Sequence, residues 1–422
     1  VQRLRPALNV VGMVGHCAVR YHVMGERSLG DEMPTADELA QMREIAAESV
    51  AGGAVGFSTS RLLGHRVPDG RCVPGTFASI PEYLAVADGM NDGGGGLFQA
   101  VLDFDTKAGH EVQLLQAMAE RCGDVLFSGG VGDGGQGPLD FYGTFLPNVR
   151  ASAGRITTAA MTRPSGTLMG LRQVPPVASS NWNTVMKLPT MEARLAALHD
   201  DKTRADLIAD GKARGLWYDA YQVHPLGNGD TPDFHIDGGL SVGELADRAG
   251  VHPVEIIVDR LIESQGRELF NVWFFNRNHQ IMGDLLSMDH VYPGLGDAGA
   301  HAGQICDADA PTHYLSYWCR DRKAVSLPKA VHQLTQQGAQ VLGLIDRGTL
   351  TVGAFADVNV FDPERLNPAY PEFANDIPGG KGRLFVRSYG YAATLVNGQV
   401  IVEQGEHTGA RPGQVLREFA RV

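Results

Sequence analysis

Short apolar segments alternate with helix-like segments over roughly the first 300 residues, and this alternation limits the fold more than any other feature. Each apolar segment is too short for a helix and suits a strand that is buried on both faces of a sheet. Strands that alternate with helices form a parallel sheet, and an alternation of this length favours a barrel over an open sheet. We therefore expect an α/β fold built on a TIM-type (β/α) barrel. The predicted strands cover residues 8–15, 54–60, 97–102, 125–128, 155–161, 271–275 and 291–296.

Helix starts are marked between these strands by a Ser or Thr followed three residues later by a Glu. In such a capping box the two side chains satisfy free backbone N–H groups at the start of a helix. The helix after Ser241 is expected to run past Val254. Residues 162–237 are less regular, with an insertion-like strand near 217–223. The capping pairs are Thr35 with Glu38, Ser79 with Glu82 and Ser241 with Glu244, and further helices are predicted within 110–120, 139–149, 191–215 and 279–287.

The character of the sequence changes at Leu350. Short apolar strands follow, separated by Asp-Pro, Asn-Gly and glycine-rich turns. Asn397-Gly398 stands between two apolar runs, which is a strong signal for a two-residue hairpin turn. We expect residues 1–349 to form the barrel domain and residues 350–422 to form part of a small composite β-sandwich.

Composition narrows the class of protein and its partners. Hydrophobic residues make up 43% and charged residues 20% of the chain, which is typical of a globular protein. The net charge of −12 and the lack of a basic run argue against nucleic acid as a partner, and no apolar segment approaches the ~20 residues that span a membrane. Five scattered cysteines without CxxC spacing suit a reducing compartment, so we expect a cytoplasmic protein. The sequence leaves the oligomeric state open, with a homo-oligomer among the alternatives.

The segment 291–301, VYPGLGDAGAH, carries the strongest candidate for chemistry. A short apolar strand ends at Gly296-Asp297, so a carboxylate emerges at the C-terminal end of a strand, where parallel barrels place catalytic groups. Asp297 could bind a metal ion or accept a proton from a metal-bound water, and His301 is close enough in sequence to assist. The alternative is that Asp297 caps the turn that follows the strand.

Three further features are candidates for a substrate or cofactor site. His16 ends a buried strand, where an imidazole without a partner is costly. It either binds a ligand or is fixed by hydrogen bonds in the barrel mouth, and we favour the hydrogen bonds. Ser58 lies in GFSTS, which lacks the last glycine of a nucleophile elbow, so we interpret it as a hydroxyl that lines a pocket. Glycines from Gly130 to Gly135 match a dinucleotide fingerprint without its acidic residue, and an active-site loop is favoured instead.

Several motifs together resemble the amidohydrolase superfamily. The last part of the chain is similar to the family signature in which a metal-binding TIM barrel leads into a small β-sandwich. Other stretches, spread from the first residues to the last, are similar to the D-aminoacylase (N-acyl-D-amino-acid deacylase) branch. The motifs are GHCAVR at 15–20, GFSTS at 56–60, VPGTFA at 73–78, GLIDRG at 343–348, GAFADV at 353–358, FDP at 361–363 and VNGQVIVEQGEHTGARPG at 396–413.

The resemblance implies that a zinc-bound water attacks an amide carbonyl, because zinc lowers the pKa of its water to ~7 and polarises the carbonyl. It makes Asp297 a metal ligand and general base, and it implies an HxH pair and a Cys ligand upstream of Val1. The chain does not begin with Met, and we expect that its first barrel strands are missing. Val101 and Gly129 stand where the family has two further metal-binding histidines, and neither can coordinate zinc. A single zinc ion on the absent pair and Asp297 is then the expectation.

We interpret the chain as a metal-dependent hydrolase of non-peptide C–N amide bonds. Its expected substrate is an N-acyl-D-amino acid or a similar small amide, with Asp297 as the catalytic residue. Arg20 or Arg61 would bind the substrate carboxylate through paired hydrogen bonds. The alternatives are a cyclic amidohydrolase with one metal ion and a homologue that binds a ligand without turnover. The expected substrate-binding residues are His16, Arg20, Ser58, Arg61 and His301.

Overall fold

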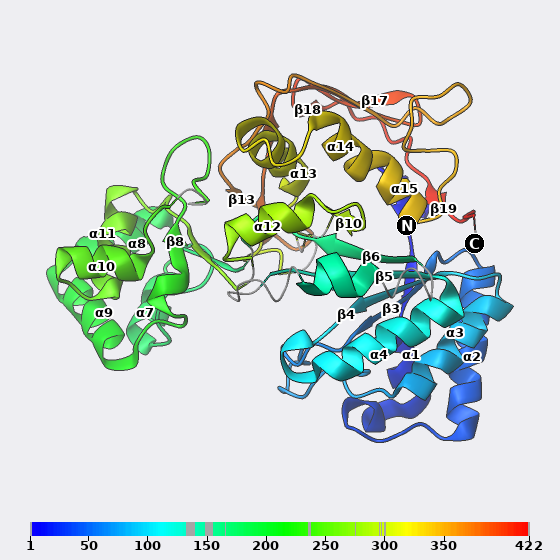
Figure 1. Ribbon diagram of the computed structural model, residues 1–422. Coiled ribbons are helices and arrows are strands. Elements are labelled where there is room, and N and C mark those ends of the chain that lie inside the picture. The colour runs from blue at the N-terminus through cyan, green and yellow to red at the C-terminus, as the bar shows by residue number, and fades with distance from the viewer. Residues whose placement is uncertain are drawn as a thin grey trace.

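The computed structural model describes residues 2–420 except for 132–139, 148–154, 165, 235–237, 275, 295, 297 and 299–300. Its centre is a six-stranded sheet in the order β10-β6-β5-β4-β3-β2, in which every neighbouring pair is parallel (Figure 1). The parallel sheet confirms the predicted α/β class. Its strands are β2 (Met13–Gly15), β3 (Gly56–Ser60), β4 (Leu97–Val101), β5 (Asp124–Gly129), β6 (Arg155–Ala160) and β10 (Val291–Tyr292).

Helices cover one face of this sheet, and the alternation of side chains along the strands explains why. Phe57, Phe98 and Phe127 are almost completely buried and pack against apolar side chains of these helices. Side chains one position further along each strand point to the opposite face, because successive residues of a strand alternate. We call that opposite face the inner face. The helices are α1 (His16–Met24), α2 (Ala36–Ala51), α3 (Ile80–Asp92) and α4 (Phe104–Cys122).

Within the described residues, β2 and β10 are the two edges of the sheet and do not pair with each other. At the β10 edge, the carbonyl oxygen of Val291 accepts hydrogen bonds from the side-chain amides of Gln333 and Gln337, at 3.1 and 3.3 Å. These glutamines belong to a π-helical turn, Gln333–Gln337, between α14 (Leu327–His332) and α15 (Gly338–Val341). The helical segment therefore covers part of a strand edge that would otherwise be open to pairing.

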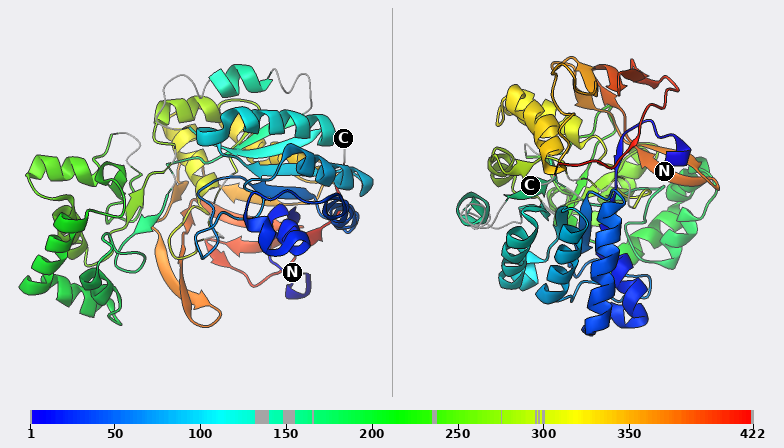
Figure 2. Two further views of the ribbon diagram at one scale, coloured as in Figure 1. Left: turned by 90° about the horizontal axis from the view of Figure 1, so that it is seen from below. Right: turned by 90° about the vertical axis from the view of Figure 1, so that its right-hand side faces the viewer.

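Residues 168–272 form a lobe that stands to one side of the sheet in Figures 1 and 2. It has a core of its own around Trp182 and Phe270, and its three strands run in the order β7-β9-β8. The lobe agrees with the insertion-like character of the sequence in this region. Its elements are β7 (Leu168–Met169), α7 (Ser180–Met186), α8 (Met191–His199), α9 (Asp201–Arg214), β8 (Val223–Pro225), α10 (Val242–Ala249), α11 (Pro253–Glu263) and β9 (Phe270–Val272).

Two predictions in this region are corrected by the structure. The strand expected at 271–275 forms in part, as β9, but it is not a barrel strand, because β9 pairs antiparallel with β7 and β8 inside the lobe. The helix after Ser241 does not continue past Val254. It ends at Ala249, where Gly250 adopts a left-handed φ of 67°, and a new helix starts at Pro253. The capping box of Ser241 and its glutamate is confirmed.

The C-terminal segment forms short strands, as expected (Figure 1). All of them except the last pair antiparallel, and the last pairs parallel with a strand near the start of the chain. Asn397 and Gly398 both have positive φ, 48° and 79°, and connect two paired strands, which confirms the hairpin. The predicted boundary between 349 and 350 stays a prediction. The strands are β11 (Val358–Phe361), β12 (Asn367–Pro368), β13 (Glu372–Ile377), β14 (Lys381–Phe385), β15 (Ser388–Tyr389), β16 (Tyr391–Val396), β17 (Gln399–Glu403), β18 (Glu406–His407) and β19 (Val415–Leu416).

The two ends of the chain meet in the fold. The strand predicted over 8–15 is interrupted at Gly12, and its first part, β1 (Val10–Val11), pairs with β19.

The helix predicted over 139–149 is represented by a π-helical turn at Phe141–Phe145. No helix in the described part of the chain combines the length and the apolar character that a membrane crossing needs. The remaining helices are α12 (His279–Leu286) and α13 (Ala310–His313).

Candidate active site

The C-terminal ends of β3, β4 and β5 place three side chains in one row on the inner face. Ser60 pairs in register with Val101, and Val101 pairs with Ser128. Ser58 lies on the same face two residues before Ser60, and its hydroxyl donates to the carbonyl of Val14 at 3.5 Å. A TIM barrel exposes its reactive groups at these strand ends. Ser58, which the sequence suggested as a substrate-binding residue, therefore lies on the inner face as expected. Its contact with substrate stays a prediction.

His16 lies on the other face of the sheet, at the start of α1, and is completely buried. Its Nε2 atom is 2.8 Å from Oε1 of Glu82, and its Nδ1 atom is 3.0 Å from the hydroxyl of Thr59. Both ring nitrogens are thus occupied by protein groups, so the interpretation that hydrogen bonds fix this ring is confirmed. The same geometry contradicts the assignment of His16 to substrate binding, because no ring atom is left open to a ligand.

Arg20 belongs to the same buried cluster. Its side chain is 1% exposed and donates to Oε2 of Glu82 at 2.6 Å and to the carbonyl of Glu32 at 2.7 Å. Glu82 does not form the predicted capping box, since Ser79 makes no side-chain cap with α3. A buried carboxylate needs charged or hydrogen-bonding partners, and Glu82 finds them in Arg20 and His16. The guanidinium that was expected to hold a substrate carboxylate therefore holds Glu82 instead.

Arg61 follows β3 and repeats this arrangement. Its Nε atom lies 2.9 Å from each carboxylate oxygen of Glu111 on α4, and its Nη1 atom donates to the carbonyl of Ala78 at 2.7 Å. Arg61 and Glu111 are both buried. By the alternation of the strand, Arg61 points with Thr59 toward the helices and not to the inner face. Its assignment to substrate binding is contradicted for the same reason as that of Arg20.

Burial controls the protonation of this cluster. It lowers the pKa of His16, while the hydrogen bond to Glu82 acts in the opposite direction. Burial also raises the pKa of Tyr83 to about 12. The Tyr83 hydroxyl donates to the carbonyl of Gly75 at 3.0 Å and lies 3.1 Å from the hydroxyl of Thr59. The cluster therefore ties α1 and α3 to the ends of β2 and β3, and it acts as a frame for the strand ends.

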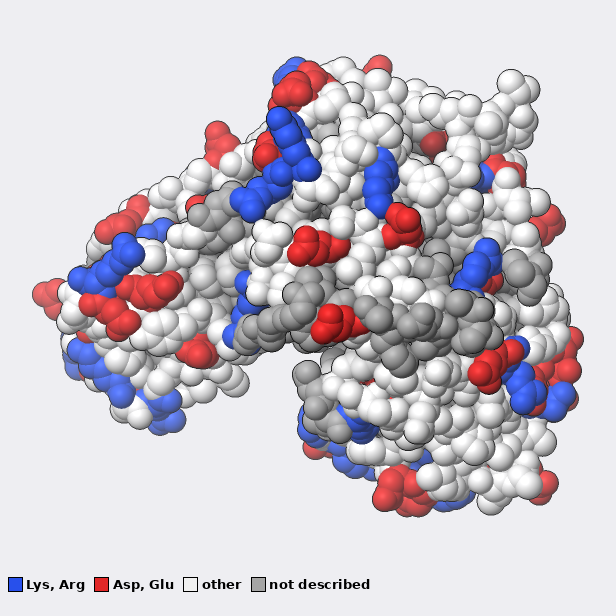
Figure 3. Space-filling view, viewed as in Figure 1, with Lys and Arg blue, Asp and Glu red and all other residues white. Residues whose placement is uncertain are grey.

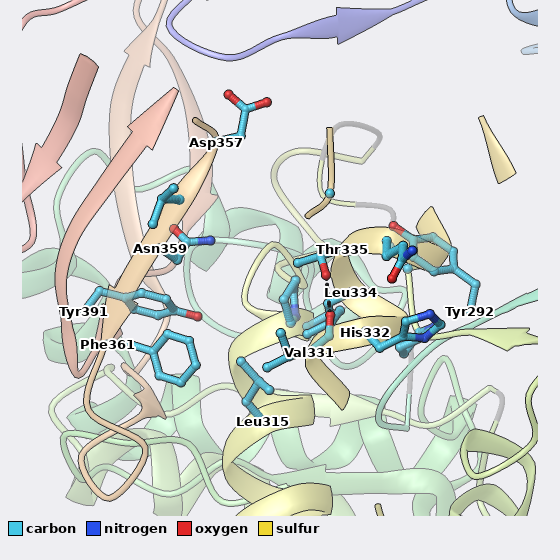
Figure 4. A pocket seen from close by; sticks show the side chains of 18 of the residues that line it. Tyr292, Leu315, Val331, His332, Leu334, Thr335, Asp357, Asn359, Phe361 and Tyr391 are labelled. Atoms are coloured by element: carbon cyan, nitrogen blue, oxygen red, sulfur yellow. Dashed lines mark hydrogen bonds between the residues drawn. The ribbon is translucent and has the colours of Figure 1, made fainter. Parts of the chain in front are cut away.

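Asp297, the predicted catalytic carboxylate and metal ligand, lies outside the described residues. Its neighbours Gly296 and Ala298 line a pocket of 890 Å³. Figure 4 shows this pocket between the helical segment that carries His332 and the strand that carries Asn359. The loop after β10 therefore borders a space large enough for a small substrate. The role of Asp297 itself stays a prediction.

His301 is exposed and has a φ of 47°, which is uncommon for a residue other than glycine. Its carbonyl accepts hydrogen bonds from the N–H groups of Gln304 and Ile305, at 2.7 and 3.0 Å. The backbone of His301 is thus part of a tight turn after the Asp297 loop. Its contact with substrate is not tested by this geometry and stays a prediction.

The described residues do not supply a metal site at the strand ends. Among them, no group of three or more His, Cys, Asp or Glu side chains is placed to hold a metal ion. Val101 ends β4 with an aliphatic side chain. A Cβ atom added at Gly129 would lie 2.7 Å from the Tyr142 hydroxyl and closer still to the Thr158 methyl, so a histidine does not fit there. Tyr142 is held in place by the N–H and the carbonyl of Gly130, at 3.2 and 3.1 Å.

A serine and a histidine on the inner side escaped the sequence analysis. The hydroxyl of Ser60 lies 2.5 Å from Nδ1 of His65, in the loop that follows β3. The pair has no sequence signature, because four residues of irregular loop separate its members. Only the GFSTS motif that ends in Ser60 drew attention to this strand end. Of the glycines that matched a dinucleotide fingerprint, Gly130 is described, whereas Gly132 and Gly135 lie outside the described part of the chain.

Comparisons with known sequences place these features in context. A family model described as "Amidohydrolase family" matches residues 4–402. N-acyl-D-glutamate deacylase of Alcaligenes xylosoxydans xylosoxydans is 26% identical over 429 aligned residues, which cover 99% of this chain and 71% of that protein. An uncharacterised protein of Mycobacterium tuberculosis is 27% identical over 442 aligned residues, with 95% of this chain and 69% of that protein covered.

Solved structures show the same fold. A D-aminoacylase structure described as defining a novel subset of amidohydrolases superposes with a TM-score of 0.60 at 19% identity, covering 99% of this chain and 73% of that chain. N-acyl-D-glutamate deacylase of Bordetella bronchiseptica, solved with zinc and a phosphonate inhibitor, gives a TM-score of 0.57 at 21% identity, covering 98% of this chain and 73% of that chain. These likenesses confirm the predicted barrel fold of the metal-dependent hydrolase type.

Proposed function

The chain belongs to the amidohydrolase family and is a hydrolase of carbon–nitrogen amide bonds, and from this premise we propose that it removes the acyl group from N-acyl-D-amino acids. The observation that carries the proposal is the alignment with N-acyl-D-glutamate deacylase, which extends over 99% of the chain. A second stretch is 37% identical to N-acyl-D-aspartate deacylase over 106 residues, 25% of this chain and 19% of that protein. Both relatives are named for acidic D-amino acids, so acidic substrates are the first to test.

In this proposal Asp297 accepts a proton from the attacking water and passes it to the leaving nitrogen. Its position in the loop that follows β10 supports the assignment, because Gly296 and Ala298 of this loop line a pocket of 890 Å³. We propose that the inner-face hydroxyls of Ser58 and Ser60 and the side chain of His301 contact the substrate. His16, Arg20 and Arg61 hold the strand ends in place from the helix side.

The metal is the part of the family chemistry that the described residues do not support. The Bordetella deacylase was solved with zinc, and a D-aminoacylase is described with a binuclear metal centre. In this chain, Val101 and the space around Gly129 exclude two histidine ligands. We propose that a metal ion, zinc by this precedent, binds singly with Asp297 among its ligands.

Two observations bear on partners and location. Figure 3 shows Lys and Arg side chains scattered among Asp and Glu on the visible face rather than gathered in one patch, which supports a small amide and not nucleic acid as the partner. All five cysteines are free thiols, which supports the proposal of a cytoplasmic location. A homo-oligomer stays an open proposal.

A substrate panel tests the proposed function. N-acetyl derivatives of D-glutamate, D-aspartate and D-leucine, their L-enantiomers, a hydantoin and a lactam are incubated with the protein. Free amine is measured, and ring opening of the hydantoin, which gives a carbamoyl acid and no amine, is followed by chromatography. We expect amine release from the D-amino acid derivatives only. Turnover of the cyclic amides alone would instead favour the cyclic amidohydrolase alternative. Thermal stabilisation by a D-derivative without any turnover would favour the ligand-binding homologue, and either result would overturn the proposal.

A further inference from the structure

Ser60 and His65 are placed as a nucleophile and its base would be. The Ser60 hydroxyl is within 2.5 Å of Nδ1 of His65, which is hydrogen-bonding distance. When Ser60 donates this bond, Nδ1 accepts it through the lone pair of a neutral imidazole and can take the proton. Ser60 is half-buried and His65 is exposed, so both residues keep contact with solvent.

The loop that carries His65 is tied down by its backbone. The N–H of His65 donates to the carbonyl of Leu62 at 3.0 Å, and the carbonyl of His65 accepts from the N–H of Val73 at 3.1 Å. The N–H of Leu63 donates to a carboxylate oxygen of Asp103, which follows β4, at 3.3 Å. Three hydrogen bonds thus fix the loop to itself and to the next strand. The imidazole is therefore positioned by the fold before any substrate binds.

The pair occupies the part of the barrel mouth where a metal ligand is missing. Ser60 is the register partner of Val101, so the two side chains are neighbours on the inner face. Val101 and Gly129 are the two positions that cannot bind metal, because one side chain is aliphatic and the other is a hydrogen atom. A polar, hydrogen-bonded pair therefore stands directly beside the position that has lost its metal-binding chemistry. Within the described residues of the row formed by Ser60, Val101 and Ser128, it is the hydroxyl of Ser60 that contacts an imidazole.

We propose that Ser60 and His65 carry out acyl transfer, with Ser60 as the nucleophile and His65 as its general base. Ser60 Oγ forms a bond to the acyl carbon of an ester or amide while its proton moves to His65 Nδ1. The bond from the acyl carbon to the leaving oxygen or nitrogen then breaks, and His65 protonates the leaving alcohol or amine. Water attacks the acyl-serine next, gives a proton to His65, and releases the carboxylic acid as Ser60 regains its proton. The inference rests on the proposed function only in placing the acyl group at the barrel mouth.

The experiment traps the acyl-serine with p-nitrophenyl acetate. The full chain, with and without a metal chelator, is mixed with the ester, quenched in acid, digested and mapped by mass spectrometry. We expect an acetyl group on Ser60, and a burst of p-nitrophenol close to one equivalent per chain in both conditions. The His65→Ala variant should slow the burst by ~10²–10⁴-fold, the range usual for loss of a general base. The Ser60→Ala variant should abolish it, and Ser60→Cys should form a thioester at the same position.

Controls separate this chemistry from trivial acylation. The side chain of Ser287 donates to the carbonyl of Asp284, and that of His407 accepts from the N–H of Gly409, so both are bonded away from this strand end and their alanine variants should keep the burst. Cys17 is a competing nucleophile near the Ser60 backbone, but burial raises the pKa of its thiol, so little thiolate is present at neutral pH. An acetyl group found on Cys17 or elsewhere and not on Ser60 would overturn the inference. An unchanged burst in the Ser60→Ala variant would also overturn the inference, provided that this variant has the melting temperature of the wild type.

The two proposals can fail separately. If N-acyl-D-amino acids are hydrolysed at the same rate by wild type and Ser60→Ala, and no acyl-serine forms, the acyl-transfer inference is wrong and the proposed function stands. If Ser60 is acylated by the ester but no N-acyl-D-amino acid is a substrate, the proposed function is wrong and the pair is an esterase site.

Discussion

The Nε2 atom of His16 lies 2.8 Å from Oε1 of Glu82, and neither side chain has any exposure to solvent. Arg20 binds the other oxygen of the same carboxylate, so the three residues form one buried unit between α1, α3 and the sheet. Two residues that the sequence suggested for substrate binding are therefore parts of the frame. The candidates for substrate binding and catalysis are then the loops and the inner-face side chains at the ends of the parallel strands.

Removing the carboxylate at the centre of that unit should destabilise the protein strongly. The Glu82→Ala variant leaves Arg20 buried without its counter-charge, and breaking a buried pair in this way usually costs about 3–5 kcal/mol. Urea unfolding of wild type and variant measures the change. The exposed carboxylate of Glu26, which pairs with Arg71 on the surface, is the control, and Glu26→Ala should leave the unfolding midpoint unchanged. Equal losses in both variants would show that the buried unit has no special role.

The loss of the Asp297 carboxylate should affect activity and not stability. Asp297→Asn keeps the shape of the side chain and removes its ability to accept a proton, so kcat/KM should fall by ~10²–10⁴-fold. The melting temperature should stay within the error of the wild type. A loss smaller than ~10-fold would show that Asp297 caps its turn and takes no part in proton transfer.

A side chain at position 129 should not be tolerated. A Cβ atom at Gly129 would collide with the Thr158 methyl and the Tyr142 hydroxyl, and overpacking of this kind costs about 1–3 kcal/mol. Chemical denaturation of Gly129→Ala measures this cost. Because Thr158→Ser removes the nearest methyl group, the double variant should recover part of the lost stability. Additive losses in the double variant would contradict the collision.

Stability should fall in acid because of His313. Burial holds the pKa of this histidine well below its ordinary value of 6.5, and the charge of Arg163 acts in the same direction. Below about pH 6.5 the unfolded chain therefore binds a proton that the folded chain does not bind. The free energy of unfolding decreases as the pH falls below this value, and it has its full value above it.

The His313→Phe variant isolates this contribution. The phenyl ring replaces an imidazole that stacks on Tyr317 and meets Phe234 edge to face, so packing is largely kept. Between about pH 7.5 and pH 5.5 the wild type should lose more stability than the variant, by at most ~1.4 kcal/mol per pH unit. Parallel pH profiles for the two proteins would show that His313 binds its proton normally when folded.

Local sequence patterns predicted the parts of the fold that are local in origin. The capping boxes at Thr35 and Ser241 form as predicted, and Asn397-Gly398 makes the hairpin, because each depends only on residues within one or two turns. Ser79 has the same pattern and forms no box. Its glutamate, Glu82, is taken by partners on α1, more than 60 positions earlier in the sequence.

Long-range pairing accounts for the rest. An apolar run such as Phe270–Val272 has the same composition in a barrel strand or in a small antiparallel sheet, and only its pairing with β7 and β8 decides between them. Likewise, the sequence alone suggests that a cationic side chain at a strand end binds an anionic ligand, because it does not show whether a carboxylate on a neighbouring helix pairs with that side chain. Glu111 on α4 decides that question for Arg61. The family motifs identified the barrel and its chemistry because they reflect the whole fold rather than one segment.

The most direct test of the central claim is the ratio of kcat/KM for N-acetyl-D-glutamate to that for N-acetyl-L-glutamate. It is measured by release of free glutamate on the protein as purified and after incubation with zinc. A D-amino-acid deacylase should favour the D-enantiomer by at least ~100-fold, since the wrong enantiomer misplaces the amide in a preorganised site. Equal rates for the two enantiomers, or release from neither under both conditions, would contradict the proposed function.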